Sequence, residues 1–201
     1  MKIVLASNNR GKLAELQAMF APLGVELVSQ GELFEGEAPE PHCTFVENAL
    51  SKARFAAERT GLPAIADDAG MCVDHFGGLP GVDTAYYCTQ FGYEKSDANN
   101  VRALLEQLQG VENRRAAMVS TLVGVRSARD PEPLIAVGRV QALIAAEPRG
   151  GNGFGFDPVL YLPELGQTFA EMAPALKHAH SHRGRATQQM LALVRERWMQ
   201  A

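Results

Sequence analysis

Two adjacent carboxylates, Asp67 and Asp68, follow the short apolar run 63–66 and precede Ala69 and Gly70. A short apolar run bounded by turn residues is typical of a buried strand. The run therefore predicts that the acids stand at the C-terminal end of a strand, where open α/β sheets bind ligands. Successive strand residues point to opposite faces, so one aspartate can face a site while the other supports the scaffold. The alternative is a strand followed by an ordinary Asp-rich turn.

A second polar group, Ser-Asn-Asn-Arg-Gly-Lys at residues 7–12, follows a predicted buried strand over residues 2–6. A helix is predicted after it, because four apolar residues recur at intervals of three and four: Leu13, Leu16, Phe20 and Leu23. The N–H groups at a helix N-terminus bind anions, and Lys12 adds a positive charge. These residues are not a Walker A loop, since GxxxxGK[ST] is absent. A plain strand–helix turn is the alternative.

Residues 148–158 form the third unusual stretch, with four glycines and two phenylalanines that end in Asp-Pro. Such a loop lets the backbone approach a ligand closely while an aromatic face stacks on it. Further along the chain, Lys177, His182 and Arg183 gather near the start of a predicted last helix. Their donors suit a phosphate or the edge of a base.

An acidic loop over residues 31–42 contains four glutamates, at positions 32, 35, 37 and 40. A run of like charge is usually solvated surface. One of its carboxylates can instead bind Mg²⁺, which takes one or two carboxylates beside phosphates and waters. Thr44 and Glu47 then match a capping box that begins a helix through about Arg59. Lys52 on that helix is either a solvated charge or a phosphate contact.

The remaining elements indicate a mixed α/β sheet flanked by helices and arranged in two lobes. Early strands alternate with helices, and a helix from the Ser96 cap to about Gln109 precedes two long strands, 115–125 and 134–145. The polar turn between those strands favours an antiparallel part of the sheet. The aromatic residues at 86, 87, 91 and 93 pack in a core or interface, or else stack on a base.

Composition narrows the class of protein further. The chain has 201 residues, 46% of them hydrophobic, and no separating linker, which predicts one domain over residues 1–201. A net charge of −4 argues against a broad nucleic-acid surface, which needs an excess of Lys and Arg. No window approaches the ~20 apolar residues of a membrane span, and no signal peptide is visible. Three cysteines without CxxC spacing favour reduced thiols in the cytoplasm.

Six motifs, in order along nearly the whole chain, resemble those of the inosine triphosphate pyrophosphatase family, and in particular its bacterial dITP/XTP pyrophosphatases. The motifs are Ser7-Asn8-Asn9-Arg10-Gly11-Lys12, Thr44-Phe45-x-Glu47-Asn48-Ala49, Ala66-Asp67-Asp68-x-Gly70, Gly77-Gly78-x-Pro80-Gly81, Gly153-Phe154-Gly155-Phe156-Asp157-Pro158 and Ser181-His182-Arg183-Gly184. Each is weak alone, but six in sequence order are specific.

The resemblance implies an elongated mixed sheet of two lobes, a nucleotide cleft between them, and a homodimer. It also implies Mg²⁺-dependent hydrolysis of non-canonical purine nucleoside triphosphates (dITP, ITP, XTP) to the monophosphate and pyrophosphate. Asp68 is then the general base and a metal ligand, with Glu40 as the second metal ligand and Glu37 as the alternative. The implied substrate-binding residues are Ser7, Asn8, Asn9, Arg10, Gly11, Lys12, Ala69, Phe154, Gly155, Phe156, Asp157, Lys177, His182 and Arg183.

The sequence departs from the family pattern at four places. The acidic pair of the loop before the capping box falls at Pro39-Glu40, which leaves the second metal carboxylate open between Glu40 and Glu37. Ala69 stands where the family usually has Ser, which removes a hydroxyl but keeps a backbone donor. Tyr86 stands where an arginine is frequent, and Leu176 where glutamate is common. Two other functions remain open from the residues: a pyrophosphatase for other nucleotides, and a catalytically silent nucleotide-binding module.

Overall fold

The computed structural model of the protein describes residues 1–199 and divides into two compact units. The first unit contains Met1–Asp68, Ser120–Gly138 and the chain from Arg183 onward. The second contains Ala69–Val119 and Arg139–His182. The chain thus passes from one unit to the other within three of its strands.

The strands form the mixed sheet that the sequence predicts. Their hydrogen-bonded order is β2-β1-β3-β5-β6-β7-β8, with β4 beside β3. Strand β1 pairs in parallel with β2 and β3, whereas the β3–β4, β6–β7 and β7–β8 pairs are antiparallel. The bounds are β1 Lys2–Leu5, β2 Glu26–Ser29, β3 Ala64–Val73, β4 Pro80–Gly81, β5 Arg115–Val125, β6 Leu134–Ile144, β7 Leu160–Leu162 and β8 Gln167–Thr168.

Four of the helices begin close to the predicted positions, and α4 was not predicted. Their bounds are α1 Arg10–Phe20, α2 Phe45–Thr60, α3 Asp97–Gln107, α4 Pro174–His180 and α5 His182–Arg197. The side chains of Thr44 and Ser96 accept hydrogen bonds from the backbone N–H groups of Glu47 and Asn99. These bonds satisfy N–H groups that the first turn of a helix leaves without partners, so both predicted caps are confirmed.

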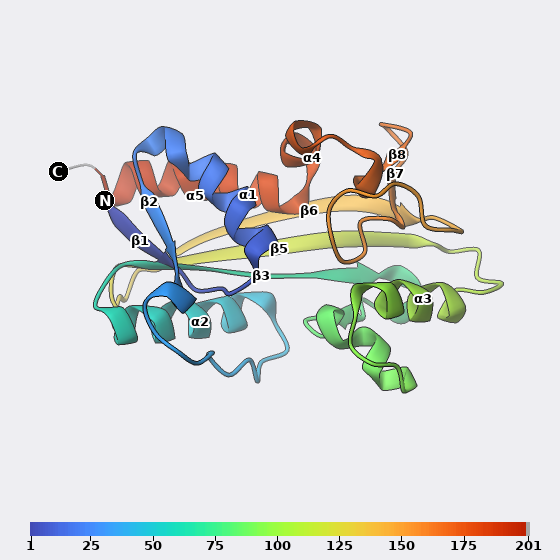
Figure 1. Ribbon diagram of the computed structural model, residues 1–201, viewed down its shortest axis with the longest axis horizontal. Helices are drawn as coiled ribbons and strands as arrows, with labels where there is room; N and C mark the ends of the chain where they lie inside the picture. The colour runs from blue at the N-terminus through green and yellow to red at the C-terminus, as the bar shows by residue number, and fades with distance from the viewer. Residues whose placement is uncertain (200–201) are drawn as a thin grey trace. The chain divides into compact units, whose positions relative to one another are not determined.

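In the first unit, helices cover both faces of the strands, with α1 and α5 on one face and α2 on the other (Figure 1). The side chains of β1 alternate between these two faces. Ile3 and Leu5 pack with α1 and α5, whereas Val4 and Ala6 pack with the alanines of α2. A strand that is buried on both faces reads as a continuous apolar run, as β1 does.

In the second unit, α3 packs its apolar face into a core that also contains the buried sides of β3, β5 and β6. Tyr87 is buried in this core, with its ring beside Phe76 and Phe91. Tyr86 is 54% exposed, and the ammonium of Lys95 lies 3.7 Å from its ring centroid. The predicted packing role therefore holds for Tyr87 and not for Tyr86.

Within residues 1–199, every helix is too short or too polar to cross a lipid bilayer.

The tight contact between α2 and the sheet gives a first prediction. Ala53 is fully buried between neighbours that are themselves small, so Ala53→Leu should force α2 away from the sheet. We expect a loss of about 1–3 kcal/mol in the free energy of unfolding, measured by urea titration. Glu58→Leu adds the same side chain at an exposed position of the same helix and should change stability by less than about 0.5 kcal/mol. Equal losses in the two variants would contradict close packing of α2.

Candidate active site

Asp67 and Asp68 lie inside strand β3, which continues through them to Val73. The prediction that the strand ends at the acids is wrong. The strand that ends is β1, whose pairing with β3 stops at Leu5 and Ile65. Both acids therefore stand just beyond the carboxyl end of β1, which is the kind of sheet edge where α/β proteins bind ligands.

The alternation of β3 sends the two carboxylates to opposite faces of the sheet. Asp67 lies two residues after Ile65 and so points to the same face of β3, on which Ile65 packs with α1 and α5. Asp68 points to the same face of β3 as Ala64 and Ala66, which pack against α2. The expectation of two faces and two environments is confirmed.

The Asp67 carboxylate is buried and is surrounded by donors. Its Oδ2 lies 3.1 Å from Lys12 Nζ and accepts a 3.1 Å hydrogen bond from Arg183 Nε, and its Oδ1 accepts a 2.6 Å bond from Ser120 Oγ. Arg183 also donates from Nη1 to Glu15 Oε2 at 2.8 Å. Asp67 thus connects α1, β5 and the start of α5 through charge-assisted hydrogen bonds.

These contacts outweigh burial in setting the charge of the group. Burial by itself raises the pKa of the Asp67 carboxyl, but the positive charges of Lys12 and Arg183 and the Ser120 hydrogen bond hold it far below its usual range. Burial lowers the pKa of the Arg183 guanidinium, and the carboxylates of Asp67 and Glu15 more than reverse that shift. Asp67 is therefore a permanently ionised carboxylate with its lone pairs engaged.

Asp68 has a different environment on the α2 face. Its Oδ1 accepts a 2.7 Å hydrogen bond from Lys52 Nζ, and the same ammonium donates to Glu40 Oε2 at 2.8 Å. The side chains of Asp68 and Lys52 are 10% and 14% exposed, whereas that of Glu40 is 48% exposed. Two carboxylates from different segments thus meet at one cation, and the pair is open to solvent on the Glu40 side.

Burial is the largest influence on the pKa of the Asp68 carboxyl and raises it, while the charge and hydrogen bond of Lys52 offset only part of that shift. Burial also raises the pKa of Glu40, but there the hydrogen bond and charge of Lys52 prevail and the pKa is lowered. Burial lowers the pKa of the Lys52 ammonium, and the two carboxylates more than compensate, so it is raised. Lys52 is protonated in this arrangement.

The Asp68–Glu40 pair fits a magnesium ion. Asp68 Oδ2 is buried and accepts no hydrogen bond from the described residues, so a strong acceptor is available beside a second carboxylate. No group of three or more His, Cys, Asp or Glu side chains suited to a metal occurs within residues 1–199. Two carboxylates suffice for Mg²⁺, which completes its coordination with phosphate oxygens and waters.

The two glutamates that the sequence left open have different neighbours. Glu40 lies beside Asp68 through their shared bond to Lys52, whereas Glu37 Oε1 accepts a 3.1 Å hydrogen bond from Asn8 Nδ2. The geometry thus favours Glu40 as the partner of Asp68. Glu37 instead contacts the polar loop before α1.

Residues 7–12 form the polar start of α1 as predicted. Asn9 is the N-cap, and its side chain accepts a 3.1 Å hydrogen bond from the N–H of Lys12. Ser7 Oγ accepts from the N–H of Asn9, also at 3.1 Å. Asn8, Asn9 and Arg10 are exposed, so the polar side chains at this helix N-terminus are accessible to an anion.

In the second unit, the glycine–phenylalanine loop is held by carboxylates. Asp157 Oδ2 accepts 2.9 Å and 2.8 Å hydrogen bonds from the Phe154 N–H and Lys177 Nζ. The N–H of Gly155 donates to Asp97 Oδ2 on α3 at 2.8 Å. The Lys177 ammonium also lies 4.8 Å from the Phe154 ring centroid, within cation–π distance. Lys177, Asp157 and Phe154 are thus brought together.

Glycine is required at position 153 of this loop. Its φ is +79°, and a Cβ there would come within 2.0 Å of Asp157 Oδ2. Phe156 differs from Phe154, because it is 3% exposed and belongs to the apolar core. His182 is also 3% exposed, with its ring centroid 6.3 Å from that of Phe169. Ala69 lies on β3 directly after Asp68.

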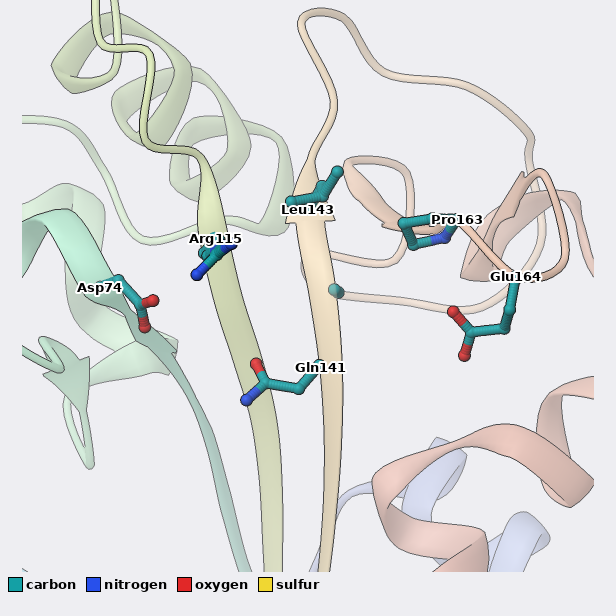
Figure 2. Close-up of a pocket in the computed structure, with 7 residues that line it drawn as sticks. Asp74, Arg115, Gln141, Leu143, Pro163 and Glu164 are labelled. Atoms are coloured by element: carbon teal, nitrogen blue, oxygen red, sulfur yellow. The ribbon is translucent and has the colours of Figure 1, made fainter.

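A surface pocket of about 380 Å³ also lies in the second unit (Figure 2). It contains none of the predicted site residues, and its charged side chains are of both signs. The lining residues are Asp74, Arg115, Gln141, Ala142, Leu143, Pro163 and Glu164. We do not assign the candidate site to this pocket.

Sequence reasoning missed several residues that organise these groups. Glu15 lies three residues after Lys12 on α1, a spacing that places both on one helix face and could have been recognised. Ser120 lies within a strand, and Asp97 lies 58 residues from its loop partner Gly155. Nothing local in the sequence indicates either contact.

Comparisons with known proteins show the family of this chain. Residues 3–193 match the sequence model of the Ham1 family, and the chain belongs to this family. It is 87% identical over 199 residues to the "dITP/XTP pyrophosphatase" of Delftia acidovorans, covering 99% of this chain and 100% of the relative. The family resemblance seen in the motifs is confirmed.

Solved structures show the same fold. A HAM1 protein from Coxiella burnetii is 40% identical with a TM-score of 0.89, covering 98% of this chain and 99% of that one. A nucleoside-triphosphatase, also titled dITP/XTP pyrophosphatase, from Mycobacterium abscessus is 42% identical with a TM-score of 0.75, covering 95% and 99% of the two chains. The predicted mixed α/β fold class is confirmed.

The Asp67 network gives a second prediction. Asp67→Asn should leave the buried Arg183 without its full counter-charge, at a cost of about 3–5 kcal/mol in the free energy of unfolding. Ser120→Ala removes only one donor to the same carboxylate and should cost about 0.5–1.5 kcal/mol. Chemical denaturation of both variants checks the order. Equal losses would mean that the charge of Asp67 is not what stabilises the network.

Proposed function

We propose that this protein hydrolyses non-canonical purine nucleoside triphosphates, with dITP, ITP and XTP as substrates, to the monophosphate and pyrophosphate. The observation that carries the proposal is the 87% identity, over almost the full chain, to a relative named dITP/XTP pyrophosphatase. The Asp68 environment supports it, because a buried carboxylate with an unpartnered oxygen lies beside a cation and a second carboxylate. Removal of such nucleotides would cleanse the nucleotide pool.

The phosphates are assigned to the first unit. The N-terminus of α1 and the side chains of Ser7–Lys12 are suited to bind phosphate oxygens. Lys12 and Lys52 offset the negative charge that builds at the transferring phosphoryl group. Asp67 holds Lys12 in place from below the site and remains ionised, so Lys12 keeps a fixed position.

Asp68 is assigned as the general base and, with Glu40, as the holder of Mg²⁺. A carboxylate can accept the proton of the water that attacks phosphorus, provided that it lies within hydrogen-bond reach of that water. When bound, Mg²⁺ neutralises phosphate charge and lowers the pKa of coordinated water. Asp68 Oδ2 is the atom that we assign to this chemistry, because Oδ1 already accepts the Lys52 hydrogen bond.

The base is assigned to the loop of the second unit. We propose that Phe154 stacks on the purine, with Lys177 and Asp157 fixing the ring and the loop backbone. His182 and Arg183 complete the predicted set. Arg183 donates to Asp67 and Glu15, which favours a role in ordering the phosphate-binding residues.

The proposal includes a homodimer, as the family resemblance implies, and a cytoplasmic location. Cys43, Cys72 and Cys88 are all free thiols in the structure, which agrees with a reducing compartment.

The substrate class is tested with a panel of dITP, XTP, dUTP and dGTP and detection of released pyrophosphate. We expect kcat/KM for dITP and XTP to exceed that for dGTP and dUTP by at least about 100-fold, because buried polar groups left unpaired reject the wrong base. Equal rates on canonical nucleotides would favour a general pyrophosphatase. Binding without turnover of any nucleotide would favour a silent binding module.

The role of Asp68 is tested by Asp68→Asn, which keeps the shape of the side chain but removes the proton acceptor. We expect kcat to fall by at least about 100-fold, the size typical of a lost general base. The substitution also removes the charge that pairs with the Lys52 ammonium, so the free energy of unfolding is measured alongside kcat to separate a loss of catalysis from a loss of folded protein. Near-normal turnover would exclude Asp68 as the base.

A further inference from the structure

Lys52 occupies the place between two carboxylates that a divalent cation would also take. Its ammonium lies 2.7 Å from Asp68 Oδ1 and 2.8 Å from Glu40 Oε2, so one cation bridges the two carboxylates. We propose that Lys52 is an internal counter-ion that competes with the divalent cation for the Asp68–Glu40 pair, and that it yields this place only when the triphosphate arrives. The inference rests on the proposed function, which assigns the metal to this pair.

The backbones that carry the two carboxylates are both anchored near Lys52. Asp68 is fixed within β3, and Glu40 is two residues from His42, whose backbone is held by the buried side chain of Asn48. Asn48 Oδ1 accepts from the His42 N–H at 3.1 Å, and Asn48 Nδ2 donates to the His42 carbonyl at 3.0 Å. This paired contact ties the end of the acidic loop to the helix that also carries Lys52.

Charge then decides which cation the pair holds. An ammonium and a divalent cation a few ångströms apart repel each other even in water. With Lys52 in place, the carboxylates have a counter-charge and bind a free divalent cation weakly. A triphosphate changes the balance, because it brings several negative charges to which the flexible Lys52 side chain can transfer.

The inference predicts opposite effects of one substitution on metal binding and on turnover. Lys52→Met should bind Mn²⁺, a paramagnetic substitute for Mg²⁺, at least about tenfold more tightly than the unmodified protein when no nucleotide is present. Its kcat on dITP should nevertheless fall, because the phosphates lose a positive charge. If the only role of Lys52 were structural, or to bind phosphate, its replacement would not raise the affinity of the protein for the metal.

The experiment measures Mn²⁺ binding at pH 8 by the loss of the free-ion paramagnetic resonance signal, with and without the non-hydrolysable α,β-methylene analogue of dITP. Lys52→Arg keeps the charge and should retain weak binding. Arg54→Met removes an exposed cation on another face of α2 and should leave Mn²⁺ affinity unchanged. With the analogue present, the higher Mn²⁺ affinity of Lys52→Met relative to the unmodified protein should shrink or reverse.

Mn²⁺ affinity of Lys52→Met equal to or weaker than that of the unmodified protein would overturn the inference, as would an advantage that the analogue leaves undiminished. Circular dichroism confirms that each variant is folded. Two further variants, Glu40→Gln and Asp68→Asn, distinguish a failure of the Lys52 competition from a failure of the proposed function. Both variants should weaken Mn²⁺ binding if the metal binds at these carboxylates. If neither does, the metal assignment itself is wrong. If both do and Lys52→Met binds no tighter, only the competition is excluded.

Discussion

The buried charge of Asp67 is the constraint on which the first unit depends. An ionised carboxylate in the interior is costly unless charges and hydrogen bonds compensate it. Asp67 receives them from α1, from β5 and from the start of α5, through Lys12, Ser120 and Arg183. Elements that are far apart in the sequence are therefore held at fixed positions around one strand residue. The start of α1, with its exposed polar side chains, is among them.

The neighbouring Asp68 has an environment very different from that of Asp67, although the two residues are adjacent in the chain. The alternation of β3 places it on the α2 face, where one cation offsets its burial only in part. Its second oxygen is left without a hydrogen bond among the described residues. The charge of the same residue type, one position apart, is thus fully compensated in one case and only partly in the other, since the neighbours that each face provides differ.

In the second unit, hydrogen bonds to carboxylates hold the backbone of the candidate base-binding loop in place. The carboxylates of Asp97 and Asp157 accept hydrogen bonds from the backbone N–H groups of this glycine–phenylalanine loop. Glycine at 153 gives the close approach that this arrangement needs. Phe154 remains partly exposed at the surface of the loop while Phe156 enters the core, although the two are indistinguishable by residue type.

Much of the fold could be read from the sequence, because it depends on local patterns. Apolar periodicity and capping residues such as Thr44 and Ser96 place most helices and strands within a few residues, and the motif order identifies the family. The end of β3 was misplaced, since two acids look like a turn, and only the extent of pairing shows that the strand continues.

The sequence by itself determined that Asp67 and Asp68 would face different environments, because strand alternation is a property of the backbone. Only the tertiary structure decided which of them would be neutralised by Lys12 and Arg183 and which would share Lys52 with Glu40. The reason is physical. The charge state and reactivity of a carboxylate depend on the groups within a few ångströms, and those groups come from segments that only folding brings together.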